Sequence, residues 1–123
     1  MECPKSFGET EQVSVGKRMV ERCLQCFALF FYQLTQSMVD DLLLCVDIDT
    51  GNDELGVLSN EMVYVDCPNC NRIMDQRQIE GRHRIRFELC TSCYAVFLDA
   101  GELRQYTRPE TLADFRSLLP GPA

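Results

Sequence analysis

Four cysteines in the second half of the chain carry the clearest chemical signal in the sequence. They form two pairs with the same two-residue spacing, at residues 67–70 (Cys-Pro-Asn-Cys) and 90–93 (Cys-Thr-Ser-Cys), and 19 residues separate the pairs. A Cys-x-x-Cys turn lets both sulfur atoms face one point, and tetrahedral Zn²⁺ is held by four such thiolates at about 2.3 Å. We therefore predict a structural zinc site at Cys67, Cys70, Cys90 and Cys93, in preference to disulfides or unligated buried thiols.

The first half of the chain repeats this pattern in incomplete form. Residues 23–26 (Cys-Leu-Gln-Cys) are followed by an aromatic residue, an alanine, an aliphatic residue and a phenylalanine, and residues 90–93 are followed by the same classes. Residues 3–6 (Cys-Pro-Lys-Ser) match residues 67–70, except that Ser6 replaces the last cysteine. This agreement indicates the internal duplication of one small module.

Residues 67–106 resemble the transcription factor IIB-like zinc-finger family, a short zinc ribbon. That family reads Cys-Pro-x-Cys, then a hairpin, then Cys-x-x-Cys-Gly-Gly-x-Trp-Leu-Asp-x-Gly-Glu-Leu, and residues 98–103 of this chain are Leu-Asp-Ala-Gly-Glu-Leu. The resemblance implies that Cys67, Cys70, Cys90 and Cys93 are the zinc ligands. Tyr94-Ala95 stand where the family has Gly-Gly, so the turn after the second cysteine pair could differ, and Phe97 replaces the family's Trp.

The fold class that follows is a small metal-bound α+β fold: tandem zinc ribbons, which are β-hairpins with zinc knuckles, each followed by a short helix. Residues 1–46 form a degenerate ribbon module, 47–61 an acidic linker, and 62–123 a ribbon module with C-terminal helices. We expect hairpin strands at 13–15 with 18–22, and at 73–79 with 84–89 around a turn at 80–82. In 84–89 apolar and charged residues alternate, which predicts a half-buried strand.

Helices should follow each ribbon. Asp99 and Glu102 have the spacing of a capping box, in which Asp99 accepts the free backbone N–H groups at the start of a helix and Glu102 reaches back. Ser37 could begin a similar helix in the first module, and a last helix should begin at 107–110 with Leu112, Phe115, Leu118 and Leu119 on its apolar face. Between the modules, Asp47 and Asp49 suggest a calcium loop, but the glycine and the final glutamate of that motif are misplaced.

The first module leaves two alternatives open. Three of its cysteines, Cys3, Cys23 and Cys26, could hold a second zinc ion together with Cys45, an acid such as Glu9, or water, because a serine hydroxyl is a poor ligand. Alternatively, the site has lost its metal and persists as packing. Cys45 itself lies in an apolar stretch and is expected to behave as a small buried apolar residue.

Charge and composition bear on the partners. The formal net charge is −7, which opposes sequence-independent binding of nucleic acid. Five arginines nevertheless fall between the cysteine pairs of the second module, and they either coat a solvated ribbon or contact nucleic acid or an acidic protein: Arg72, Arg77, Arg82, Arg84 and Arg86.

The sequence argues against an enzyme. His83 is the sole histidine, and no nucleophile–base set or glycine-rich phosphate loop accompanies it.

No apolar run approaches the ~18 residues of a membrane span, and eight cysteines without a secretory signal favour a cytoplasmic protein with metal-bound thiols. We expect a zinc-dependent adaptor with a transcription-linked or regulatory role and a protein partner; the alternative is an accessory subunit that forms oligomers.

One apolar run, residues 27–32, is too dense for a small ribbon to bury alone. A strand would turn part of it outward, and large exposed apolar patches usually mark contacts. We predict that the matching segment of the second module, residues 94–98, covers it within the same chain; a second chain is the next candidate.

Overall fold

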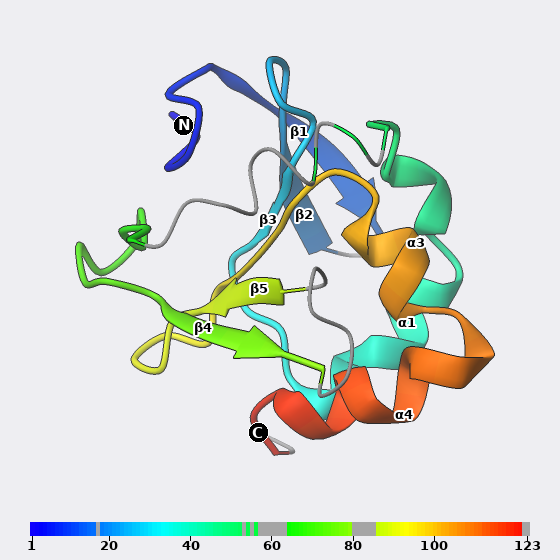
Figure 1. Cartoon of the computed structure of the whole chain (residues 1–123). Coiled ribbons are helices and arrows are strands. Elements are labelled where there is room, and N and C mark those ends of the chain that lie inside the picture. Colours follow the sequence, from blue (N-terminus) through cyan, green and yellow to red (C-terminus); the bar gives the residue numbers. More distant parts are fainter. Residues whose placement is uncertain (17, 53, 55, 57–63, 80–85, 122–123) are drawn as a thin grey trace.

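Six short strands form one antiparallel sheet that both halves of the chain share. The computed structural model describes residues 1–16, 18–52, 54, 56, 64–79 and 86–121. The first three strands are β1 (Thr10–Val15), β2 (Arg18–Cys23) and β3 (Leu29–Phe31), and the last three are β4 (Asp75–Gln78), β5 (Arg86–Leu89) and β6 (Val96–Leu98). Their spatial order is β1-β2-β3-β6-β5-β4 (Figure 1), so β3 and β6 join the two halves at the centre.

The junction brings together the two segments that the sequence predicted to meet. Leu29 pairs with Leu98, Phe30 with Phe97, and Phe31 with Val96. The contact is edge to edge within the sheet, because both segments are strands whose backbone groups need partners. The prediction that residues 94–98 lie against residues 27–32 is therefore confirmed, and Tyr32 keeps 39% of its surface exposed.

Side chains on the two faces of the sheet enter two different cores. Leu29 and Phe31 point into a core shared with the helices, whereas Phe30 and Phe97 lie on the other face with the cysteines. This alternation follows from the two-residue period of a strand. Both faces of β3 and β6 are thus covered, which explains the continuous apolar sequence of these strands.

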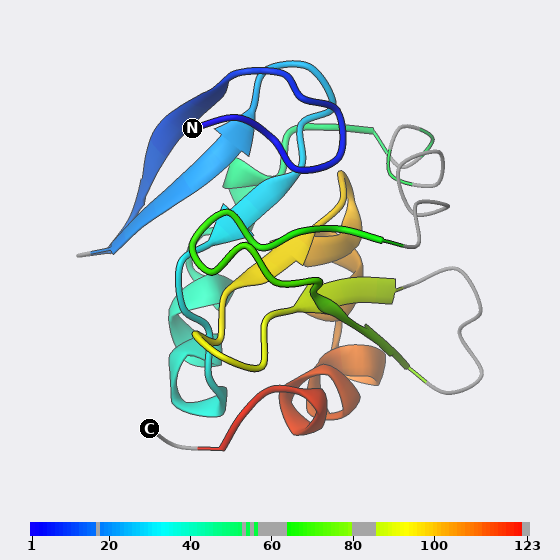
Figure 2. The same cartoon turned by 90° about the vertical axis from the view of Figure 1, so that its left-hand side faces the viewer.

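The helices lie together on one face of the sheet (Figures 1 and 2). They are the 3₁₀ turns η1 (Gln36–Met38) and η2 (Val46–Ile48), and the α-helices α1 (Val39–Leu43), α3 (Glu102–Tyr106) and α4 (Pro109–Leu118). Pro109 opens α4 as predicted, at a position where no backbone N–H is needed. Three buried aromatic rings pack where α3 and α4 meet β5: Phe87, Tyr106 and Phe115.

The predicted strands and helices lie close to those observed, with two differences. The first hairpin is longer than expected, since β1 begins at Thr10, and the strand expected over residues 73–79 is confined to Asp75–Gln78. The turn predicted at residues 80–82 lies outside the described residues. Where the strand over residues 84–89 is described, the expectation of a half-buried surface was wrong: Glu88 faces the cysteine side and is fully buried.

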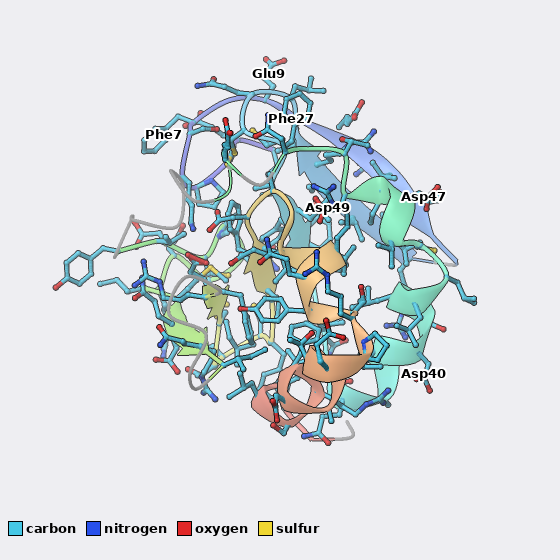
Figure 3. All side chains as sticks on the ribbon, turned by 45° about the vertical axis from the view of Figure 1, so that its right-hand side comes forward. Phe7, Glu9, Phe27, Asp40, Asp47 and Asp49 are labelled. Atoms are coloured by element: carbon cyan, nitrogen blue, oxygen red, sulfur yellow. The ribbon has the colours of Figure 1, made fainter. Side chains whose placement is uncertain are left out.

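The start of α3 is held differently from the predicted capping box. Glu102 does reach back, accepting the backbone N–H of Asp99 at 2.6 Å, but the Asp99 side chain is directed to Lys5. The backbone N–H groups of Gly101 and Arg104 donate instead to the carboxylate of Asp49, at 2.9 and 3.1 Å (Figure 3). Asp49 is buried, so this part of the predicted acidic linker packs against the second half of the chain.

Candidate metal centres

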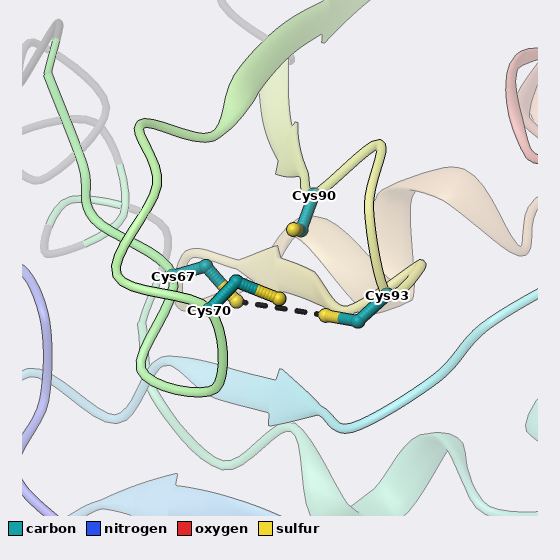
Figure 4. A group of neighbouring side chains, drawn as sticks. All are labelled: Cys67, Cys70, Cys90 and Cys93. Carbon is teal, nitrogen blue, oxygen red and sulfur yellow. Dashed lines mark hydrogen bonds between the residues drawn. The ribbon is translucent and has the colours of Figure 1, made fainter.

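The four cysteines of the second half converge on one point. The sulfur atoms of Cys67, Cys70, Cys90 and Cys93 all lie within 4.8 Å of one another, and the Cys67 and Cys93 sulfurs are 3.7 Å apart (Figure 4). Four sulfurs at about 2.3 Å from a tetrahedral zinc ion would be separated by about 3.8 Å. Two of the four residues are buried and two are half-buried, so the cluster sits at the edge of the core.

Backbone hydrogen bonds build the turn that carries each cysteine pair. In the turn that starts at Cys67, the N–H of Cys67 donates to the carbonyl of Arg72 at 2.8 Å, and the N–H of Asn71 donates to the carbonyl of Cys67 at 2.8 Å. The same two bonds, with lengths of 2.8–3.1 Å, recur in the turns that start at Cys3, Cys23 and Cys90. All four turns therefore present their first and fourth side chains in the same way.

Each turn also contains one residue in the left-handed conformation. It is the residue after the fourth position, and φ lies between 56° and 64° at Phe7, Phe27, Asn71 and Tyr94. Glycine adopts such a φ without strain, whereas other residues lose about 1–2 kcal/mol. Tyr94 stands where the zinc-ribbon family that the sequence resembles has its first glycine, and it still adopts the left-handed conformation.

Burial and hydrogen bonds shift the pKa values of three thiols in the four-cysteine cluster. Burial raises the pKa of Cys67 to about 11, and the hydrogen bond with Cys93 raises that of Cys70 to about 12. Burial opposes the ionisation of Cys90 as well, but hydrogen bonds from the backbone of Cys93 and Ser92 lower its pKa to about 7. Four thiolates this close repel one another, and a bound dication would remove that penalty.

Three of the four cysteines of the first half form a second cluster. The sulfur atoms of Cys3, Cys23 and Cys26 lie within 4.8 Å of one another, with 3.8 Å between Cys3 and Cys26, and all three residues are buried. The hydroxyl of Ser6 lies 3.2 Å from the Cys23 sulfur. Neither Cys45 nor Glu9 belongs to this group in the part of the chain that the structure describes. Neither of these two suggested residues therefore supplies the fourth ligand.

One thiol of this first cluster is disposed to ionise. The hydrogen bond from Cys26 lowers the pKa of Cys3 to about 5, and the same bond raises that of Cys26. The backbone N–H of Ser6 also points at the Cys3 sulfur, at 3.5 Å. Cys45 is half-buried and packs against the helix-side core, as expected for a small apolar residue.

A buried ionic group links the first cluster to the second half of the chain. The ammonium of Lys5, which lies between Cys3 and Ser6, is 2.5 Å from a Glu88 carboxylate oxygen and 2.7 Å from one of Asp99. It also lies 5.1 Å from the centre of the Phe97 ring. The sequence did not predict this group; Glu88, a charged residue between two apolar ones in a strand, signals a buried charge but does not identify its partner.

Burial and the nearby charges set the state of these carboxyls. Burial raises the pKa of Glu88 to about 7 and that of Asp99 to about 6, and the attraction of Lys5 limits both rises. Burial raises the pKa of Glu102 well above its ordinary value, helped by the charge of Asp99. The pKa of Lys5 is raised: burial opposes its charge, but the two carboxylates outweigh that effect.

The predicted arginine surface is only partly described. Arg72 is exposed, whereas Arg77 pairs with Asp75 at 2.7 Å. Arg86 is half-buried, and its charge acts on Glu88 and Asp99. Arg82, Arg84 and His83 lie outside the described residues. The arginines that can be placed therefore do not form one continuous cationic face.

Comparison with known proteins gives no match: no family model, no curated protein and no solved structure corresponds to this chain. Within the part of the chain that the structure describes, no helix is long and apolar enough to cross a membrane. The two cysteine clusters are therefore the observations on which a function can be argued.

Proposed function

We propose that this chain is a zinc-binding structural module with an adaptor role, built from two zinc ribbons that resemble the transcription factor IIB-like family. In this proposal the ribbons arose by duplication and the first is degenerate. The observation that carries it is the convergence of the Cys67, Cys70, Cys90 and Cys93 sulfurs from two turns with the same backbone bonds.

The donor set suits zinc and a structural role. Four thiolates in a tetrahedral arrangement are typical of zinc sites that stabilise small folds, and four protein ligands leave no open position for a substrate. When bound, zinc would supply the cross-link between the two turns. The chain's own backbone pairing then holds β6 between β3 and β5. We propose on this basis that the protein is not an enzyme.

Replacing one ligand tests the proposal. Cys90→Ser should lose zinc from this site and unfold the second half of the chain, because structural zinc contributes on the order of 10–16 kcal/mol of apparent binding free energy at pH 7. Cys45→Ser is the matched control, since Cys45 is outside both clusters, and it should keep the metal content and the fold. Elemental analysis and circular dichroism provide the measurement. A reduced, folded wild-type protein without zinc would contradict the proposal.

A protein partner is the favoured contact, in a transcription-linked or regulatory role and within the reducing cytoplasm. The net charge of −7, the Arg77–Asp75 pair and the buried surroundings of Arg86 all weigh against a phosphate-binding surface. We expect the dissociation constant for random duplex DNA to be about 10⁻⁴ M or weaker at physiological salt. Fluorescence anisotropy measures the dissociation constant. Sub-micromolar binding would contradict this expectation, and binding that survives Arg82→Glu with Arg84→Glu would also exclude these two arginines as its cause.

The alternative role as an oligomer-forming subunit rested on the aromatic run at residues 27–32. In the structure Phe30 and Phe31 are buried within the chain, between β2 and β6. The feature that argued for a second chain is therefore satisfied internally, and the adaptor role is preferred.

A further inference from the structure

We propose that Cys3, Cys23, Cys26 and Ser6 form a second zinc site, in which three thiolates and one oxygen donor hold an ion that exchanges more readily than zinc held by four thiolates. The oxygen is the Ser6 hydroxyl or a water that it positions. This site stands apart from the one at Cys67, Cys70, Cys90 and Cys93, and either can fail without the other.

The backbone places Ser6 at the fourth corner of the cluster. The turn at residues 3–8 has the same bonds as the turn at residues 67–72: the N–H of Cys3 donates to the carbonyl of Gly8 at 2.8 Å, and that of Phe7 donates to Cys3 at 2.9 Å. Ser6 therefore occupies the position that Cys70 has in the other cluster. Its hydroxyl is 3.2 Å from the Cys23 sulfur, near the ~3.5 Å expected between oxygen and sulfur ligands of one tetrahedral zinc ion.

Backbone N–H groups are directed at two of the sulfur atoms of this cluster. The N–H groups of Gln25 and Cys26 point at the Cys23 sulfur, at 3.3 and 3.4 Å, and that of Ser6 points at Cys3. The turn thus directs backbone donors at sulfur atoms, and a metal-bound thiolate can accept hydrogen bonds from them.

Both turns of the first cluster also retain a strained residue. Phe7 and Phe27 have φ of 61°, which costs a residue other than glycine about 1–2 kcal/mol. Such strain persists when something else depends on the conformation, and it is concentrated at functional sites. Here the left-handed residue ends the turn that brings the first and fourth side chains together, so a bound metal accounts for its retention.

The oxygen ligand explains why this site should release its metal more readily. A serine hydroxyl keeps its proton near neutral pH and is a weaker metal ligand than a thiolate. Zinc binds soft sulfur ligands more tightly than such an oxygen. Three thiolates leave the zinc complex with one negative charge, compared with two for four thiolates.

The test counts the zinc ions bound to the full-length chain at increasing concentrations of one chelator. The wild type should bind two zinc ions and release one well before the other. Cys23→Ser should bind one, and the early-released ion should be the one that is missing. Ser6→Cys should keep two ions and delay the early release by at least tenfold in chelator concentration, whereas Ser6→Ala should advance it. Cys45→Ser, the control, should match the wild type.

Cobalt substitution gives an independent readout. The thiolate-to-cobalt absorption of the doubly loaded wild type should correspond to seven sulfur ligands, and that of Ser6→Cys to eight. If the wild type binds one ion and Ser6→Cys binds two, the native cluster is packed thiols and this proposal is wrong. If the wild type binds one ion and Cys23→Ser removes it, this site stands and the proposed site at Cys67, Cys70, Cys90 and Cys93 fails.

Discussion

At the residue scale, the four turns show how the same local geometry arises from different side chains. Each has a left-handed residue after its fourth position, yet the residues are Phe7, Phe27, Asn71 and Tyr94, and none of them is glycine. Asparagine tolerates this conformation best, because its short polar side chain can form local hydrogen bonds. The backbone bonds common to the four turns thus fix φ more strongly than residue preference does.

Asn71 offers the cleanest test of this strain, because its side chain is exposed. Asn71→Val should lower the free energy of unfolding of the zinc-loaded protein by about 1–2 kcal/mol, since a β-branched residue cannot adopt a positive φ without strain. Asn71→Gly should change it by no more than a few tenths. Arg72→Val, at the neighbouring exposed position, is the control and should be close to wild type. Denaturant unfolding at fixed zinc concentration measures all three, and an unaffected Asn71→Val would show that the turn relaxes.

At the element scale, Lys5 shows what sequence reasoning could not reach. The strands and the cysteine pairs could be predicted, because alternation and Cys-x-x-Cys spacing are local patterns. The contact of Lys5 with Glu88 and Asp99 joins residues that are more than 80 positions apart in the chain, and it depends on β3 pairing with β6. A shorter but still long separation, 52 and 55 positions, hid the role of Asp49 at the start of α3, which the sequence attributed to Asp99.

Breaking the Lys5 group should be costly. Lys5→Met should lower the free energy of unfolding by about 3–5 kcal/mol, because it leaves Glu88 and Asp99 buried without their cation. Adding Glu88→Gln and Asp99→Asn to Lys5→Met should recover much of that loss, since no buried charge then remains unpaired. Urea unfolding at constant zinc gives the comparison.

A more solvated ion pair supplies the control for Lys5. Arg77 and Asp75 are 2.7 Å apart on β4 with 34% and 52% of their side-chain surfaces exposed, so Arg77→Met should cost less than about 1 kcal/mol. If Lys5→Met proves as mild as Arg77→Met, the Lys5 ion pair does not hold the first turn to the second half of the chain.

At the scale of the whole molecule, the sheet makes the two halves interdependent. The cysteine clusters lie on one face of it and the helices on the other, and β3 and β6 belong to both cores. Two ribbons of about 40 residues would have little core of their own, and small domains of that size need a metal or a partner. Here each half is the partner of the other, in addition to any metal it binds.

Separating the halves should therefore expose the junction. The fragment of residues 61–123, loaded with zinc, lacks both β3 and Lys5, which leaves the apolar edge of β6 unpaired. An unpaired apolar edge strand promotes self-association, so the fragment should aggregate or unfold at a lower temperature than the full chain. Adding a peptide of residues 1–50 should restore a one-to-one complex, measured by analytical ultracentrifugation.

In that peptide Phe30→Asp should abolish the complex because Phe30 is buried beside Phe97, whereas Phe7→Asp should preserve it because Phe7 is 67% exposed. A zinc-loaded fragment that stays monomeric and as heat-stable as the whole protein would show that the halves fold independently and that the shared sheet adds nothing to their stability.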